Sequence, residues 1–252
     1  MKVAVILVIA ALLLAASYFL MHEREAPAPK PAPPAAAAPP VDKGPKHPLP
    51  DAPSPVPLPK LGESDATIGE ALASLLGADA FKRLLVPEDL VRRIVATIDN
   101  LPREAYAARL NPIVPLGGSL NVTGKDESLA IDPGNSRRYA AYVRAVESID
   151  AKSLVEGYVR LYPLFQQAYV DLGYPKGYFN DRLVEAIDNL LDAPELKAPA
   201  KLVTPHALYE YADPELEHRS SGQKVLMRIG NDNARKVKAK LREIRQELTG
   251  RL

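Results

Sequence analysis

Hydrophobic and polar residues follow three different patterns along the chain, and the first is an apolar run without a charge at residues 3–20. A helix rises about 1.5 Å per residue, so this run spans roughly 27 Å, against a hydrocarbon core of about 30 Å. The run predicts a single-pass transmembrane helix that anchors residues 1–22 in the lipid bilayer. A cleaved signal peptide is the alternative, because it also combines a basic start with an apolar core.

Two features favour an anchor that is retained. The apolar run exceeds the usual length of a signal-peptide core, about 7 to 15 residues. The small-residue pattern Ala26-Pro27-Ala28 places proline where a signal peptidase needs an extended, unobstructed bond. A cut near residues 15–17 stays open.

The charges beside the apolar run predict its orientation. Lys2 and the amino terminus are positive, whereas residues 23–25 sum to about minus one. Segments with positive flanks tend to keep those flanks in the cytoplasm. In a bacterium we therefore expect an inner-membrane protein whose N-terminus is cytoplasmic and whose residues after His22 are periplasmic.

The second pattern, rich in proline and alanine, covers residues 23–60. Proline fixes its own φ and pushes the preceding residue out of the helical region. The tract is therefore predicted to be a disordered, extended stalk with a reach on the order of 100 Å. A passive spacer is the favoured interpretation. The alternative is a proline-motif ligand for another domain, carried by PVPLPK at residues 55–60.

The third pattern, beyond residue 60, has the period of amphipathic helices. Ser64 or Asp65, Pro87, and Asn135 or Ser136 are suited to begin three of these helices. Apolar residues recur every three or four positions over residues 64–76, 87–100, 135–149, 152–172, 180–191, 222–229 and 232–248.

Two stretches have an extended pattern instead. Residues 119–131 place LNVT and SLAI around the turn sequence Gly124-Lys125-Asp126-Glu127, which predicts a β-hairpin. Residues 202–212 are expected to form a second extended, pairing stretch. The predicted fold class is mainly α with a minor β-hairpin, and residues 61–252 are predicted to form one α-rich soluble domain.

Composition and motifs argue against several kinds of chemistry. The 252 residues carry a net charge of +1 and no cysteine, so a nucleic-acid partner is not expected and thiolate chemistry is excluded. The sequence lacks the motifs of zinc proteases, P-loop hydrolases, dinucleotide-binding enzymes and calcium loops, and no cofactor or metal is predicted. His206 and His218 accompany no G-x-S-x-G elbow, and both are interpreted as surface or hydrogen-bonded residues.

Four sequence blocks carry a resemblance to a known family. They are VATIDNLPR at 95–103, YPLFQQAYVDLGYPKGYFNDRLVEAIDNLL at 162–191, GQKVLMRIG at 222–230 and VKAKLREIR at 237–245. These blocks resemble a proteobacterial family known only as domain of unknown function number 3014, and the likeness extends over residues 61–252. The resemblance implies a bacterial protein with a membrane helix, a proline-rich stretch and this domain. It implies no activity and no catalytic residues.

Acidic residues follow one face of the predicted helix 180–191. Asp181, Glu185 and Asp188 recur at steps of three and four, with Asp192 after them, opposite an apolar face. A solvated surface is the ordinary interpretation. Like charges four residues apart cost a few tenths of a kcal/mol, roughly, and a basic partner or a cation would relieve that cost.

Two further charged features have local explanations. Asp99 ends a predicted helix and is expected to pair with Arg103, one turn along the chain. The helix 232–248 has an apolar seam surrounded by basic residues. Packing of this seam against its own domain is favoured, and a basic docking helix is the alternative.

Aromatic residues are concentrated between residues 158 and 179. Tyr158, Phe165 and Tyr169 follow helical spacing and are expected in the core. The loop 173–179 is the candidate recognition surface, because clustered tyrosines combine apolar area with a polar tip. Together with the acidic face it gives these candidate partner-binding residues: Tyr174, Tyr178, Phe179, Asp181, Glu185 and Asp188.

The first functional hypothesis is a noncatalytic envelope scaffold or adaptor, whose stalk presents an interaction domain to another envelope protein. The alternative is a carboxylate-dependent hydrolase that acts on cell-envelope carbohydrate or peptide. That reaction needs two acidic side chains that converge in a cleft. An aromatic-lined groove over paired acids would favour the enzyme, and an aromatic patch without them would favour binding. No catalytic residue is assigned.

Overall fold

The computed structural model of the chain describes residues 44–50, 57–104, 108–205 and 208–250. The predicted membrane anchor and most of the predicted stalk therefore lie outside the described residues. Within the described part, no helix is both long and apolar enough to cross a bilayer. The structure thus describes the predicted helical domain together with two pieces of the proline-rich tract.

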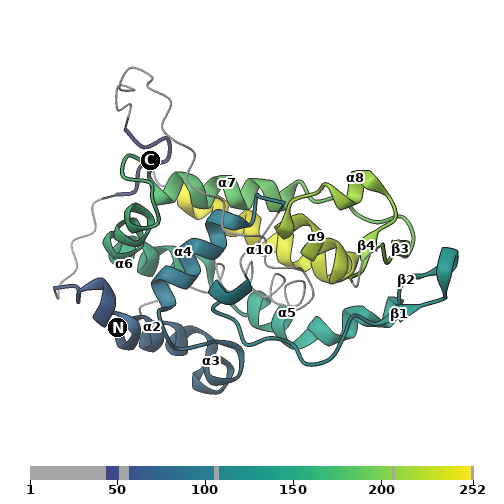
Figure 1. Cartoon of the computed structure of the whole chain (residues 1–252). Helices are drawn as coiled ribbons and strands as arrows, with labels where there is room; N and C mark the ends of the chain where they lie inside the picture. Colours follow the sequence, from purple (N-terminus) through teal and green to yellow (C-terminus); the bar gives the residue numbers. More distant parts are fainter. Residues whose placement is uncertain (1–43, 51–56, 105–107, 206–207, 251–252) are drawn as a thin grey trace.

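Helices account for most of the described fold, and two small antiparallel hairpins accompany them (Figure 1). The mainly helical fold class with minor β-hairpins is confirmed. The helices are α2 (Asp65–Leu76), α3 (Ala78–Leu84), α4 (Leu90–Asn100), α5 (Ala140–Glu147), α6 (Ala151–Asp171), α7 (Phe179–Leu191), α8 (Pro214–Glu217), α9 (Ser221–Arg228) and α10 (Asn231–Thr249). The strands are β1 (Val122–Thr123), β2 (Ala130–Ile131), β3 (Leu202–Val203) and β4 (Glu210–Tyr211).

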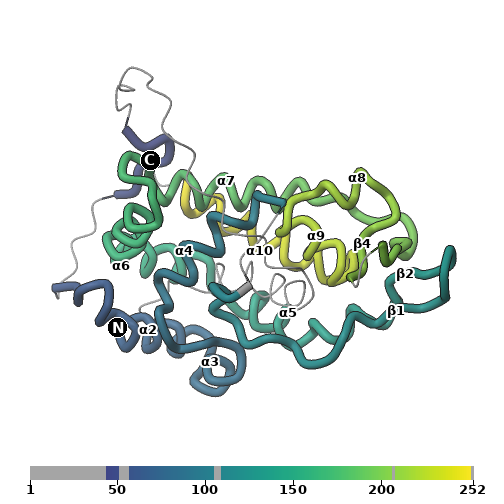
Figure 2. The backbone as a smooth tube through the Cα atoms, in the orientation of Figure 1, coloured from purple at the N-terminus to yellow at the C-terminus, as the bar shows by residue number. Residues whose placement is uncertain are grey.

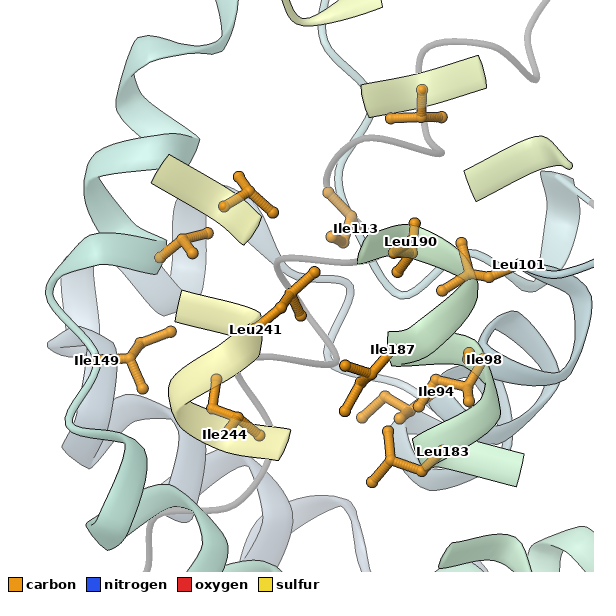
Figure 3. Packing of buried hydrophobic residues seen from close by; sticks show 14 of the residues in the cluster. Ile94, Ile98, Leu101, Ile113, Ile149, Leu183, Ile187, Leu190, Leu241 and Ile244 are labelled. Carbon is orange, nitrogen blue, oxygen red and sulfur yellow. The ribbon is translucent and has the colours of Figure 1, made fainter. Parts of the chain in front are cut away.

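The core forms where α4, α6, α7 and α10 pack against one another. Figure 3 shows buried side chains of α4, α7 and α10 that point toward a shared interior. These side chains are Ile94 and Ile98 of α4, Leu101 directly after α4, Leu183, Ile187 and Leu190 of α7, and Leu241 and Ile244 of α10. Burial of each contributes roughly 1.5 to 3 kcal/mol before conformational entropy is counted. The apolar seam of α10 therefore packs against its own domain, as the favoured interpretation has it.

An aromatic cluster joins α6 to the first turn of α7. Tyr158 and Phe165 of α6 have ring centroids 5.6 Å apart, and Phe165 stacks on Phe179 of α7 at 5.8 Å. Tyr169 contacts the same Phe179 ring at 5.7 Å. All four side chains are at most 6% exposed. The prediction that Tyr158, Phe165 and Tyr169 belong to the core is confirmed.

The start of α4 differs from the sequence prediction. The helix begins at Leu90 rather than Pro87, because the carboxylate of Asp65 accepts the backbone N–H groups of Asp89 and Leu90 at 2.8 and 2.9 Å. Asp89 adopts a left-handed φ of 51° just before the helix. A carboxylate from α2 thus caps the N-terminus of α4, where the helix dipole favours negative charge.

The segment before α5 also begins differently from the prediction. Asp132 caps the 3-10 helix Pro133–Tyr139 by accepting from the Gly134 N–H at 2.6 Å. Asn135, predicted as a cap, is instead fully buried. Its amide donates to the Arg228 carbonyl at 3.0 Å and accepts from the Asn121 N–H at 3.2 Å. Asn135 therefore ties this segment to α9.

The two hairpins lie at the end of the domain away from α6 (Figures 1 and 2). Val122 pairs with Ile131 in the first hairpin and Leu202 with Tyr211 in the second. A bridge between Ala130 and Lys201 joins the hairpins edge to edge. Both predicted extended stretches therefore pair, although each strand is only two residues long.

The buried tyrosines predict a loss of stability in alkali. Burial raises the pKa of Tyr158 well above its usual value and that of Tyr162, Tyr169 and Tyr211 to about 12. The folded state then holds more protons than the unfolded chain, whose tyrosines titrate at about 10. The stabilisation is full below about pH 10 and is lost as the pH rises toward about 12.

Urea unfolding of the full chain at a series of alkaline pH values measures this loss, and absorbance of tyrosinate follows the titration. We expect part of the eleven tyrosines to ionise only as the protein unfolds. A single transition near pH 10 for all of them in a folded protein would contradict the burial described here.

Candidate binding face at the α6–α7 corner

The loop between α6 and α7 is held in one conformation by hydrogen bonds. Gln166 of α6 donates to the Gly177 carbonyl at 2.7 Å and accepts the Phe179 N–H at 2.8 Å. The Gly177 N–H donates to the Tyr174 carbonyl at 3.0 Å, and the Tyr174 N–H donates to the Tyr169 carbonyl at 3.3 Å. A single glutamine side chain therefore fixes both the end of the loop and the start of α7.

Tyr174 is the aromatic anchor of this loop. Its ring stacks on Tyr169 with centroids 4.5 Å apart and planes 16° from parallel. Its hydroxyl donates to the Asp99 carboxylate at 3.1 Å and accepts from the Arg103 guanidinium at 2.6 Å. The side chain is half-buried. It contacts Tyr169 and Asp99 and is partly open to solvent.

Asp99 is a buried carboxylate with two charge partners, one from the turn after α4 and one from α7. Its side chain is 7% exposed and lies 2.8 Å from Arg103, the pairing that the sequence predicts. Arg182 of α7 donates to the same carboxylate at 3.0 Å and also to the Asp99 carbonyl. Burial lowers the pKa of Arg182, but its hydrogen bond to Glu185 and the charge of Asp99 raise that pKa above its usual value. Arg182 therefore stays charged where it meets Asp99.

Phe179 is not part of the candidate surface, and this corrects the sequence prediction. Its side chain is 0% exposed and stacks in the aromatic cluster. As the first residue of α7, it falls on the same helix face as Leu183 and Ile187. A partner could reach Phe179 only by opening the core. Tyr178, the residue before it, is half-buried.

The acidic face of α7 is largely neutralised within the chain. Arg182 pairs with Glu185 at 2.8 Å, and Arg245 of α10 pairs with Asp188, with one nitrogen to oxygen distance of 3.1 Å. These arginines supply the basic partners that relieve the predicted repulsion. Asp192 is exposed at the end of the helix. Among the described residues, no group of three or more potential ligands is placed to hold a metal ion.

Asp181 has a different kind of partner, a piece of the proline-rich tract. Its two carboxylate oxygens accept the backbone N–H groups of Lys46 and His47 at 2.9 and 2.8 Å. Asn180 donates its side-chain amide to the His47 carbonyl at 2.7 Å. Residues 44–50, here named the docked segment, therefore lie against the N-terminal end of α7. This part of the predicted stalk is in contact with the domain.

Two exposed aliphatic side chains lie where α6 ends. The end of α6, the loop 173–179 and the first turns of α7 are here named the α6–α7 corner. Val170 and Leu172 are 37% and 41% exposed at the end of α6, directly before the loop. Among the described residues, only Val203 joins them as a large hydrophobic side chain with such exposure. The corner thus combines two exposed aliphatic residues, a rigid loop and the carboxylate of Glu185, whose side chain is 62% exposed.

Comparison with known families identifies one that matches this chain. Residues 90–245 match the family described as "Protein of unknown function (DUF3014)". The chain belongs to this family. The match begins at the first residue of α4 and ends in α10 at Arg245, so it contains the whole α6–α7 corner, whereas the docked segment precedes it. Neither the comparison with curated proteins nor that with solved structures gave a match.

A cavity of about 360 Å³ lies in the DUF3014 domain away from the α6–α7 corner, between β2, α9 and the start of α10. Asp132 and Asp232 are both in its lining, which includes no aromatic side chain among the residues described. Asp132 is engaged as a helix cap, and Asp232 is 91% exposed and pairs with Arg235 at 2.7 Å. His218 is exposed at the end of α8, and His206 lies outside the described residues.

Sequence reasoning about the DUF3014 domain missed Arg182, Val170 and Leu172. Arg182 is 83 residues from Asp99 along the chain, and no spacing rule connects them. Val170 and Leu172 are apolar, so the sequence suggests that they are buried. Their exposure depends on how α6 sits in the fold. The burial of Phe179 did have a signal, since Phe179, Leu183 and Ile187 recur every four residues on the apolar face.

Removal of the Asp99 carboxylate should strongly destabilise the DUF3014 domain. Asp99→Ala takes from Arg182, whose side chain is 13% exposed, the buried one of its two carboxylate partners, and a broken buried pair costs up to about 3 to 5 kcal/mol. Tyr174→Phe removes one hydroxyl while both arginines remain, at a cost of about 1 kcal/mol.

Urea unfolding of the full chain measures both free energies. The matched control is Asp171→Ala, since Asp171 is 41% exposed and 3.6 Å from Arg92. Its loss should stay within about 0.5 kcal/mol. Equal losses for Asp99→Ala and Asp171→Ala would show that the buried network does not hold the corner together.

Proposed function

We propose that this DUF3014 protein is a noncatalytic adaptor of the bacterial envelope, anchored in the inner membrane by its first helix. Its proline-rich tract links that helix to the periplasmic domain, and the α6–α7 corner binds another envelope protein. The exposure of Val170 and Leu172 beside a rigid loop is the observation that carries this proposal. Isolated exposed aliphatics are common, but these border an ordered loop and a charged face.

The order of the corner supports a binding role in energetic terms. A partner that docks on a flexible loop must first order it, at about 0.5 to 1.5 kcal/mol for each immobilised side chain. Gln166 and the Tyr169–Tyr174 stack already hold this loop. Leu172 can therefore contact a partner without a large entropic cost. Glu185 at the border favours a partner whose apolar surface has basic residues beside it.

The alternative function, a carboxylate-dependent hydrolase, receives less support. Such an enzyme needs one carboxylic acid and one carboxylate on either side of the substrate bond. Of the two aspartates in the cavity, Asp132 accepts a backbone N–H and Asp232 pairs with Arg235 in solvent. The aromatics that would stack on a sugar lie at the other end of the domain, within the α6–α7 cluster. The adaptor is therefore the better interpretation.

A substitution at Leu172 tests the docking face without disturbing the core. Leu172→Gln should weaken binding of the partner about 5- to 30-fold, since a central apolar contact contributes about 1 to 2 kcal/mol. Its effect on folding stability should stay within about 0.5 kcal/mol. Quantitative mass spectrometry after crosslinking in gently solubilised membranes gives the recovery of each protein.

The matched control is Val203→Gln, because Val203 has nearly the same exposure, 42%, on β3. A partner of the corner should be lost with Leu172→Gln and retained with Val203→Gln. If every captured protein survives Leu172→Gln at wild-type levels, the corner is not the docking face.

A reporter tests the membrane part of the proposal. The uncharged run and the positive N-terminal flank predict that a reporter fused after Leu252 is active in the periplasm. The mature protein is expected to retain its first helix, which mass spectrometry of the N-terminus checks. Reporter activity in the cytoplasm would reverse the orientation, and a mature N-terminus near Tyr18 would replace the anchor with a cleaved signal peptide.

A further inference from the structure

The contact between α7 and the docked segment is made through the peptide backbone. Pro45 and Pro48 have no N–H, so the stretch between them has only two backbone donors, those of Lys46 and His47. Both donors bond to Asp181. The carbonyl of His47 accepts from Asn180. Two adjacent side chains of α7 thus recognise the main chain of an extended, proline-flanked dipeptide.

Two side chains near Asp181, those of Asn180 and Tyr158, each have a buried polar atom without a hydrogen bond in the described part of the chain. Asn180 is 1% exposed and Tyr158 is 2% exposed. The Oδ1 atom of Asn180 and the hydroxyl of Tyr158 have no hydrogen-bond partner among the described residues. Such buried groups usually have a partner, and each one left without it costs free energy. The Asn180 side chain therefore keeps a spare acceptor beside the amide that donates to His47.

We propose that Asn180 and Asp181 form a binding site for the backbone of an extended, proline-rich peptide, and that residues 44–50 are its resident ligand. The site recognises two consecutive N–H groups and one carbonyl of a segment with proline on both sides. This proposal does not rest on the adaptor function, because it concerns a contact within the chain and different residues from Val170 and Leu172.

The chemistry of the docked segment suits such a site. A residue before proline is confined to extended conformations, so His47 is preorganised before it binds. This lowers the entropic cost of ordering, as in other modes of proline-rich recognition. Hydrogen bonds to an ionised carboxylate are roughly twice as strong as neutral ones. Leu49 adds a hydrophobic contact, since it is half-buried against the domain core.

Hydrogen exchange in the full chain in detergent tests the resident contact. A proteolytic fragment that covers residues 45–50 has three backbone amides, those of Lys46, His47 and Leu49, because the other residues are prolines. We expect the first two amides to be protected in the wild type. In Asp181→Ala both should exchange about tenfold faster or more, since each loses a charge-assisted bond.

The control is Asp192→Ala, which removes an exposed carboxylate at the other end of the acidic face. It should leave the protection of Lys46 and His47 unchanged. Exchange of both amides at unprotected rates in the wild type would overturn the proposal, and so would the same protection in Asp181→Ala as in the wild type.

A double variant of the docked segment separates recognition from folding. Lys46→Pro with His47→Pro removes both N–H donors and leaves every residue of the domain in place. This full-length variant should bind the labelled peptide acetyl-GPKHPLP-amide, measured by fluorescence anisotropy at protein concentrations up to about 1 mM, the order of the effective concentration of a tethered segment. The wild type should bind it several-fold more weakly, because its site is occupied.

Two comparisons decide the outcome. Binding should disappear when Asp181→Ala is added to the double variant. A peptide with proline in place of the residues that correspond to Lys46 and His47 should not bind. If the double variant keeps its melting temperature but binds no GPKHPLP peptide, the site does not recognise peptides and the proposal is wrong. The double variant also keeps the test decisive if Asp181→Ala alone fails to fold.

Discussion

The arrangement of this domain depends on one buried negative charge, the carboxylate of Asp99 at the end of α4. A helix C-terminus and a buried position both disfavour an anion, so the charge is stable only with cationic partners close by. Arg103 and Arg182 supply them, and the hydroxyl of Tyr174 completes the set. Because Asp99 belongs to α4, Arg182 to α7 and Tyr174 to the loop between α6 and α7, the contacts of one carboxylate tie these three elements together.

The same constraint determines which side chains the α6–α7 corner exposes. Tyr174 cannot leave Asp99 without breaking a stack and two hydrogen bonds. The loop must therefore turn sharply after α6, and this turn leaves Leu172 in solvent. A buried charge that stabilises little by itself thus selects one conformation of a surface loop.

The parts of the fold that sequence predicts are those with local causes. The spacing of apolar residues predicts the bounds of α7 and α10 to within one residue at each end. The four-residue spacing of Asp99 and Arg103 predicts that these two side chains pair. Contacts between distant segments cannot be predicted in this way. Asp65 caps a helix that begins 25 residues later, and Asp181 binds backbone 135 residues away. No period in the chain encodes such contacts, since each needs two surfaces that only the finished fold brings together. At the candidate site, sequence therefore places the acidic helix and the loop correctly and assigns Phe179 to the wrong side.

The docked segment has a consequence for how the domain would stand relative to the bilayer. A domain tied only through the whole proline-rich tract could turn freely, at up to about 120 Å from the membrane in polyproline II geometry. With residues 44–50 bound to α7, only residues 23–43 separate the first helix from the domain, about 65 Å at most. Under the proposed topology, the tether would leave the domain at its α6–α7 end, opposite the β1–β2 hairpin (Figure 1). Leu172 would then lie at the same end of the domain as the point from which the tether leaves, so that a partner bound there would meet the domain beside its own tether.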